Sequence, residues 1–149
     1  MQYKKLLLGV DFSEPCHDAL RTAIEIAHRE RTDLVLVHVS RPIIPVAPDV
    51  MVSVEDCDHI ELHLAEWHHE AERGGAPRVR HTVVNGTPWH GLVEVMRASS
   101  FDLAVVGTRG GVGLRHLLWG STIDQIVRYA PCPVLVVRSY GDAELREVA

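Results

Sequence analysis

Cysteine is scarce in this chain, with 3 residues among 149. Cys16, Cys57 and Cys132 cannot all pair with one another, and the sequence contains no C-x-x-C motif. A fold held together by a network of disulfides is therefore excluded. A reducing compartment, the cytoplasm, fits this usage best.

Long charged runs and long apolar runs are also missing. The chain has 15 Lys and Arg against 20 Asp and Glu, which gives a formal net charge of −5 with neutral histidines, and no run of five or six like charges occurs. Because nucleic-acid phosphates are neutralised by clustered Lys and Arg, we expect no nucleic-acid partner. The N-terminal run MQYKKLLLGVDF reaches Asp11 too soon for a signal peptide, and no later run approaches a membrane span, so we expect no membrane partner.

The sequence does contain the composition of an ordinary globular domain. Hydrophobic residues make up 46% of it and charged residues 23%. The length suffices for one well-packed domain and is too short for two ordinary ones, so residues 1–149 are predicted to form a single domain.

Short aliphatic runs alternate with segments of helical periodicity. Four runs are apolar on both alternating faces, as in strands buried from both sides of a parallel sheet: Lys5–Val10, Leu34–Val39, Leu103–Val106 and Pro133–Val137. A fifth run, Val79–Val84, is more polar, which predicts an edge strand. The segments between them have the spacing of amphipathic helices: Glu14–Arg29, Val54–Arg73, Trp89–Ser99 and Ser121–Tyr129.

This order predicts one three-layer α/β domain of the Rossmann-like or flavodoxin-like type, with a five-stranded parallel sheet and helices on both faces. Ligands of such sheets bind outside the carboxyl ends of the strands, where the strand order reverses. Residues 41–54 contain three prolines and are predicted to form a loop beside the second strand, from where it could close over a ligand. Residues 139–149 are predicted to form a C-terminal tail.

The segment VVGTRGGVGLRHLLWGST, residues 105–122, follows an apolar run and is rich in glycine. Glycines let backbone N–H groups point toward one place, and a helix N-terminus adds unpaired N–H groups and partial positive charge, which suits a phosphate. Glycine-rich connections also occur without a ligand, so glycine content alone leaves a plain turn as an equal alternative. Neither G-x-x-x-x-G-K-[ST] nor G-x-G-x-x-G is present.

The glycine spacing resembles the G-x2-G-x9-G-[ST] pattern of ATP-binding members of the universal stress protein family. Gly107 and Gly110 fill the first two positions, and Gly120 and Ser121 follow after nine residues. The similarity also includes KKLLLGVDFSE, LVLVHV, NGTP, FDLAVVGTRG and APCPVLVVR, which together extend over nearly the whole chain.

The resemblance implies a site that binds ATP, either alone or together with Mg²⁺. It also implies a homodimer with a regulatory or stress-response role, and the strand order 3-2-1-4-5. In the ATP-binding members an Asp after the first strand lies near the nucleoside, the backbone after the His of the second strand faces adenine, and the glycine loop faces ribose and phosphates. The matching residues here are Val10, Asp11, Val39, Gly107, Thr108, Arg109, Gly110, Gly120, Ser121 and Thr122.

The residue types support part of this assignment independently. Asp11 and the glycine loop both follow strands, so a parallel sheet places them at one edge, where a carboxylate can accept hydrogen bonds from ribose hydroxyls. Ser121 can cap the last helix and donate its hydroxyl to a phosphate. The alternatives are that Asp11 caps the first helix and that Arg109 is a solvated loop side chain.

Catalysis is not indicated. No second carboxylate or base accompanies Asp11 near the loop, so we assign no catalytic residue and expect slow ATP hydrolysis or none. Two other functions remain open: an interaction scaffold whose pocket is empty or holds AMP or cyclic AMP, and an ATPase or nucleotidyl-transfer enzyme. No G-x-S-x-G motif supports a serine hydrolase.

Residues 55–70 contain the main rival site. His59, His63, Glu66 and Glu70 lie along one stripe of a predicted helix, where histidines four residues apart can bind zinc. The side of a solvated helix shows the same pattern, and we assign no metal site. Cys57 is expected to pack in the core stripe of this helix.

The last strand, Pro133–Arg138, is apolar on both faces and would leave an unpaired edge if it ends the sheet. Pairing with the same strand of a second chain would cover that edge in a two-fold homodimer, which the resemblance also implies. The alternative is that residues 139–149 fold over the edge.

Overall fold

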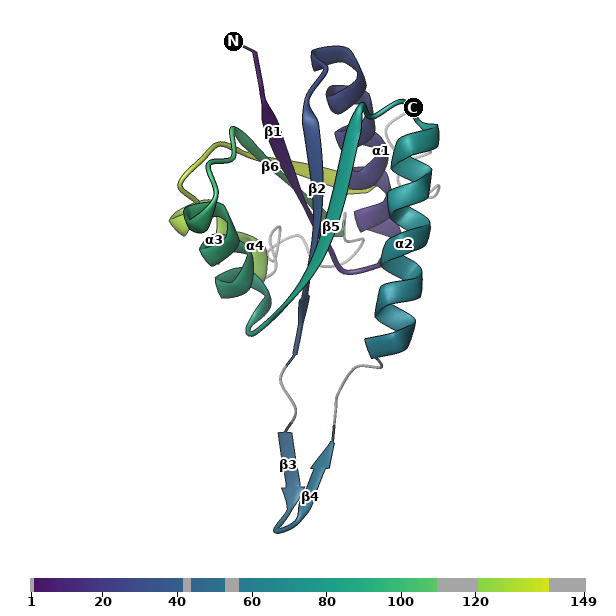
Figure 1. Cartoon of the computed structure of the whole chain (residues 1–149). Coiled ribbons are helices and arrows are strands. Elements are labelled where there is room, and N and C mark those ends of the chain that lie inside the picture. Colours follow the sequence, from purple (N-terminus) through teal and green to yellow (C-terminus); the bar gives the residue numbers. More distant parts are fainter. Residues whose placement is uncertain (1, 42–43, 53–56, 110–120, 140–149) are drawn as a thin grey trace, which may run out of the picture.

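Strands and helices alternate along the chain, as the sequence predicts. The computed structural model describes residues 2–41, 44–52, 57–109 and 121–139. The elements in these segments are β1 (Lys5–Val10), α1 (Glu14–Glu30), β2 (Asp33–Ser40), β3 (Ile44–Ala47), β4 (Val50–Val52), α2 (Cys57–Arg73), β5 (Arg78–Asn85), α3 (Pro88–Ala98), β6 (Leu103–Arg109), α4 (Ser121–Tyr129) and β7 (Val134–Ser139). Helices α1 and α2 cover one face of the main sheet, and α3 and α4 cover the other (Figure 1).

The main sheet has five parallel strands in the order β5-β2-β1-β6-β7. Counted along the chain among themselves, these strands have the predicted order 3-2-1-4-5, and the polar strand β5 lies at an edge, as predicted. The element numbers differ from that count because a separate two-stranded sheet, β3-β4, intervenes. The predicted three-layer α/β fold is confirmed.

The central strand β1 shows why the strand sequences are apolar throughout. Leu6 and Leu8 pack in the core between the sheet and helices α1 and α2, whereas Leu7 packs on the opposite side with α3 and α4. All three side chains are fully buried. Burying one leucine side chain stabilises the fold by about 1.5–3 kcal/mol. Because helices cover both faces of the sheet, positions 6–10 of this strand are all buried and favour apolar residues.

Helix α1 begins and ends at residues suited to its termini. Ser13 is the N-cap, and its side chain accepts a hydrogen bond from the Cys16 N–H at 3.3 Å. Pro15 occupies the first turn, where its missing N–H removes no helical hydrogen bond. Arg31 ends the helix in the left-handed conformation, with φ of 58°.

Within the described residues helix α2 spans Cys57–Arg73, and the first three residues of the predicted helix, 54–56, lie outside the described residues. Cys57 is exposed. The prediction that Cys57 packs in the core is therefore wrong. The buried residues of the helix are Ile60, Leu64 and Ala71. Helical periodicity indicates the direction of a side chain, but it does not indicate how far along the helix the neighbouring core extends. No helix in the described part of the chain has both the length and the apolar character needed to cross a membrane.

The proline-rich segment after β2 is the main difference from the predicted fold. Residues 41–54 were expected to form a loop, but 44–47 and 50–52 form an antiparallel hairpin, with Pro48 and Asp49 in its turn. The hairpin extends away from the sheet instead of folding back over its carboxyl edge (Figure 1). Val46 and Met51 are 58% and 61% exposed.

Candidate functional site

The sheet has one point at which its strand order reverses. From β1 the chain first adds β2 and β5 on one side and then returns to add β6 and β7 on the other. Doubly wound sheets bind their ligands at such a reversal, outside the carboxyl ends of the two diverging strands. The predicted residues Val10, Val39, Gly107, Thr108 and Arg109 lie at or near the carboxyl ends of the adjacent strands β2, β1 and β6, with Asp11 directly after β1.

Asp11 is exposed, and one of its oxygens is already in use. Its Oδ1 accepts hydrogen bonds from the Ser13 N–H at 2.9 Å and from the Ser13 hydroxyl at 2.5 Å. The alternative that Asp11 caps α1 is wrong, because Ser13 is the cap and Asp11 holds Ser13 in place. Both contacts with Ser13 engage the same oxygen, and because Asp11 is exposed, a ligand at this edge of the sheet can reach its carboxylate.

Phe12, between Asp11 and Ser13, was not among the predicted site residues, but its backbone has an unusual conformation. It has a φ of 60°, a conformation that costs an L-amino acid about 1–2 kcal/mol. Its ring packs against His38, His63 and Trp67, with ring centroids at 5.0, 5.3 and 5.4 Å. A left-handed turn usually occurs at Gly, Asn or Asp, so nothing in the sequence at this position indicated it.

Val10 and Val39 are buried, so only their backbone groups could face a ligand. The Val10 carbonyl accepts a hydrogen bond from Nδ1 of the buried His38 at 2.7 Å, which ties the ends of β1 and β2 together. The Val39 side chain packs against Gly91 of α3, on the face of the sheet that α3 and α4 cover. A Cβ atom added at residue 91 would lie only 2.7 Å from Val39 Cγ1.

Gly107 is needed for packing. A Cβ atom at this position would lie 2.6 Å from the Pro15 carbonyl oxygen and 2.8 Å from the Cys16 Cα. The first turn of α1 therefore rests directly on the β6 backbone. The next residue, Thr108, is buried, with 7% of its surface exposed.

Only some of the residues predicted to bind the phosphates are described by the structure. Gly110 and Gly120 lie outside the described residues, as do the side chains of Arg109 and Ser121. Helix α4 begins at Ser121, as predicted, so the backbone N–H groups of Ser121 and Thr122 belong to its first turn, where helical N–H groups have no partner within the helix.

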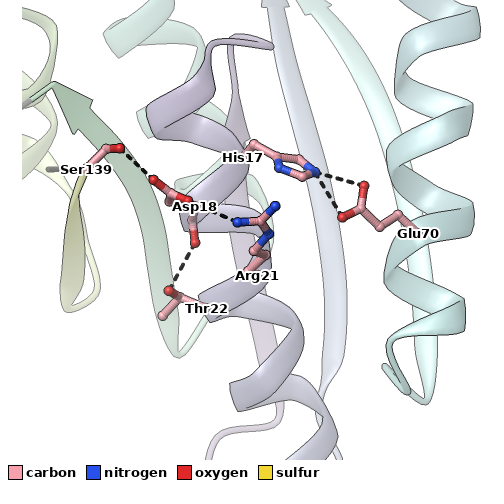
Figure 2. Close-up of polar contacts among 6 residues, drawn as sticks. All are labelled: His17, Asp18, Arg21, Thr22, Glu70 and Ser139. Atoms are coloured by element: carbon pink, nitrogen blue, oxygen red, sulfur yellow. Dashed lines mark hydrogen bonds and ion pairs between the residues drawn. The ribbon is translucent and has the colours of Figure 1, made fainter. Parts of the chain in front are cut away.

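Polar contacts fix α1 on both sides, as Figure 2 shows. Nε2 of His17 lies 2.9 Å from both carboxylate oxygens of Glu70 on α2. On the other side the Ser139 hydroxyl, at the end of β7, donates to Asp18 Oδ2 at 2.6 Å, and Arg21 lies 3.4 Å from the other oxygen. These contacts hold the N-terminal half of α1 between α2 and β7, next to Asp11.

The same contacts bear on the rival histidine site. Glu70 pairs with His17, and the His63 ring packs against Phe12, so this stripe of α2 is occupied by contacts with its neighbours. Within the described segments, no group of three His, Cys, Asp or Glu residues is arranged to hold a metal ion.

Cys16 lies beneath the site but is chemically inert. Its thiol is buried and donates a hydrogen bond to the Gly9 carbonyl at 3.2 Å. Burial raises the pKa of the Cys16 thiol to about 12, because the thiolate would lose its hydration. The thiolate fraction at neutral pH is therefore negligible, and Cys16 is not a nucleophile.

The strand order and the helices on both faces of the sheet define a doubly wound α/β protein. The chain belongs to the universal stress protein family, whose family model matches residues 2–138.

Similar proteins include a sequence relative and solved structures with the same fold. A universal stress protein from Methanocaldococcus jannaschii is 30% identical over 145 residues, which cover 91% of this chain and 82% of the relative. The universal stress protein UspA from Lactobacillus plantarum superposes with a TM-score of 0.79 at 23% identity, covering 93% of this chain and 99% of the other. A universal stress protein solved in complex with cAMP has a TM-score of 0.70 at 26% identity, covering 94% and 100%.

Proposed function

We propose that this protein binds ATP at the switch point between β1 and β6 and acts as a nucleotide-dependent regulatory or stress-response module. The observation that carries the proposal is the carboxylate of Asp11. Ser13 donates two hydrogen bonds to one oxygen, Oδ1, and Asp11 is exposed directly after the end of β1. A carboxylate oxygen held at the carboxyl edge of the sheet can accept from the neighbouring hydroxyls of a ribose.

The phosphates would be bound by backbone N–H groups. The first turn of α4 supplies those of Ser121 and Thr122, and a helix N-terminus favours negative charge. The glycine spacing through Gly110 and Gly120 supports the same placement. Adenine would lie against the backbone near Val39, because the Val39 side chain is committed to the core.

Relatives support an adenine nucleotide as the class of ligand. A universal stress protein of 26% identity is solved in complex with cAMP. Two more distant family structures, from Arabidopsis thaliana and Archaeoglobus fulgidus, contain AMP and dAMP. AMP and cyclic AMP are therefore the alternatives to ATP that a binding experiment must include.

A binding role suits the site better than rapid phosphoryl transfer. Such transfer requires stabilisation of the γ-phosphate charge and an oriented nucleophile, usually with Mg²⁺. Asp11 is the only carboxylate that the predicted ATP site includes, so we expect slow hydrolysis or none. Bound ATP would instead stabilise the fold, by about 4 kcal/mol at a concentration 1,000 times its Kd. We expect this role in the cytoplasm, where the three free cysteines would stay reduced.

We also propose a homodimer formed through β7, within Pro133–Arg138. The two edges of the main sheet differ in character. The edge strand β5 has exposed arginines at 78 and 80, which discourage pairing, whereas residues 134–137 of β7 are apolar and half-buried. A second β7 would cover these residues and satisfy the outward backbone groups.

The nucleotide proposal is tested with purified protein that is heat-denatured and whose supernatant is chromatographed for ATP, AMP and cyclic AMP. Thermal shifts with each added nucleotide should show stabilisation by ATP. Asp11→Ala should abolish most of the shift, whereas Glu25→Ala, which removes an exposed carboxylate on α1 paired with Arg29, should leave it unchanged. The absence of both bound nucleotide and any shift would refute the proposal. Phosphate release that Asp11→Ala abolishes would favour the ATPase.

The dimer is tested by light scattering and by hydrogen exchange. A dimer should protect the outward amides of β7 but not those of β5, the other edge of the same sheet. Equal exchange at both edges, together with a monomeric mass, would refute the dimer.

A further inference from the structure

The backbone at Phe12 is unusual for its position. Among the described non-glycine residues only Phe12 and Arg31 have a positive φ, 60° and 58°. Arg31 ends α1, where a left-handed residue is a common way to stop a helix. Phe12 lies in the connection between β1 and α1, where no helix ends, and a bulky aromatic residue rarely adopts this conformation. Such outliers persist only where surrounding structure holds them, and they are concentrated at functional sites.

The turn at Phe12 determines how Asp11 is presented. It brings Ser13 back toward the preceding carboxylate, so that the Ser13 N–H and hydroxyl both donate to Asp11 Oδ1. With Oδ1 held in this way, the Asp11 carboxylate has a fixed orientation at the exposed carboxyl edge of the sheet. In an extended backbone at residue 12, Ser13 would move away and the Asp11 carboxylate would rotate freely.

The Phe12 ring supplies the attraction that holds the turn. It packs between His38 of β2 and His63 and Trp67 of α2, and it contacts the main core cluster. His38 is itself fixed by its hydrogen bond to the Val10 carbonyl. The ring is therefore held from two elements, while the backbone of the same residue shapes the site.

We propose that Phe12 is a positioning residue for the nucleotide: its left-handed turn, held by the ring contacts with β2 and α2, orients the Asp11 carboxylate toward the ribose. This inference rests on the proposed function. It adds that the affinity depends on the backbone conformation of a residue that does not itself touch the ligand.

Two substitutions distinguish the effect of the left-handed backbone at residue 12 from the effect of the Phe12 ring. Phe12→Gly and Phe12→Val both remove the ring, but glycine adopts a positive φ readily and valine, branched at Cβ, does not. The Gly variant should bind ATP within about threefold of the wild type. The Val variant should bind about tenfold more weakly, because only about a tenth of the molecules would have the competent turn. Phe12→Tyr, which retains the ring and the turn, should bind as the wild type does.

A double-mutant cycle tests whether Phe12 acts through Asp11. Asp11→Asn should weaken ATP binding in the wild type and in the Gly variant, but should add little in the Val variant, where the carboxylate is already misplaced. Arg31→Val is the matched control. It places valine at the other positive φ, at the far end of α1, and should lower thermal stability without changing the affinity for ATP.

The outcomes separate this inference from the proposed function. A wild-type protein that binds neither ATP, AMP nor cyclic AMP would refute the function. Wild-type binding with equal affinity in the Gly and Val variants would overturn the role of Phe12 alone. If the Val variant does not fold, Phe12→Leu replaces it, with an affinity expected below that of the Gly variant. Equal or tighter binding by the Leu variant would overturn the inference.

Discussion

Gly107→Ala should destabilise the protein even without a ligand. The added Cβ would lie 2.6 Å from the Pro15 carbonyl oxygen, whereas ordinary contacts begin near 3.4 Å. All three nearest atoms belong to the backbone of the first turn of α1, so relief requires the helix to move off β6 by about 0.8 Å. Overpacking typically costs about 1–3 kcal/mol, and a rigid neighbour places this case near the upper limit.

The comparison that isolates this effect is Gly9→Ala on the adjacent strand. There the nearest atom, at 2.9 Å, is Cδ1 of Leu92, the end of a side chain that can rotate away. We expect a loss of about 1 kcal/mol for Gly9→Ala and about 3 kcal/mol for Gly107→Ala. At about 2–4 °C per kcal/mol, the difference in Tm between the variants is about 4–8 °C.

Urea denaturation at one fixed protein concentration, followed by circular dichroism, measures both losses. Unchanged m-values would confirm that the changes are in stability and not in the compactness of the unfolded state. A Gly107→Ala variant within about 0.5 kcal/mol of the wild type would refute the packing argument. It would leave contact with a ligand as the reason for glycine at this position.

Three further outcomes follow from the described contacts. A thiol reagent at neutral pH should label the exposed Cys57 rapidly and the buried Cys16 only after unfolding, as peptide mapping by mass spectrometry would show. Burial and the nearby His68, whose Nδ1 lies 2.7 Å from Nδ1 of His81, lower the pKa of His81. The unfolded state therefore binds more protons, and stability should fall as pH drops below about 6.5. His81→Gln should flatten that part of the stability curve, and an unchanged slope would contradict the assignment. Asp102→Ala removes a carboxylate oxygen that accepts from two backbone N–H groups at the start of β1, at 2.7 and 2.8 Å, and should cost about 2 kcal/mol in urea denaturation. A loss no larger than that of an exposed carboxylate would refute this role.

The sequence by itself determined the elements of the main sheet and its coverage. Strand β1 has the predicted bounds Lys5–Val10, and α4 has the predicted bounds Ser121–Tyr129. Strand β5 alternates exposed and partly buried residues, as its polar run predicted. These features are local, because the pattern of apolar side chains along a strand indicates whether one face or both faces of that strand will be buried. The family resemblance supplied the strand order, and the structure confirms it.

Only the tertiary structure decided the features that depend on distant contacts. The pairing of His17 with Glu70 joins residues 53 positions apart, and no local pattern connects them. The same holds for Gly107, where the neighbour that excludes a side chain is the first turn of a helix more than 90 residues earlier in the chain. Phe12 adopts a conformation that its residue type disfavours, because rings from β2 and α2 hold it there. The local sequence determines which conformation each segment prefers, but packing between distant segments can override that preference. In the connection after β1, this packing shapes the proposed site at Asp11.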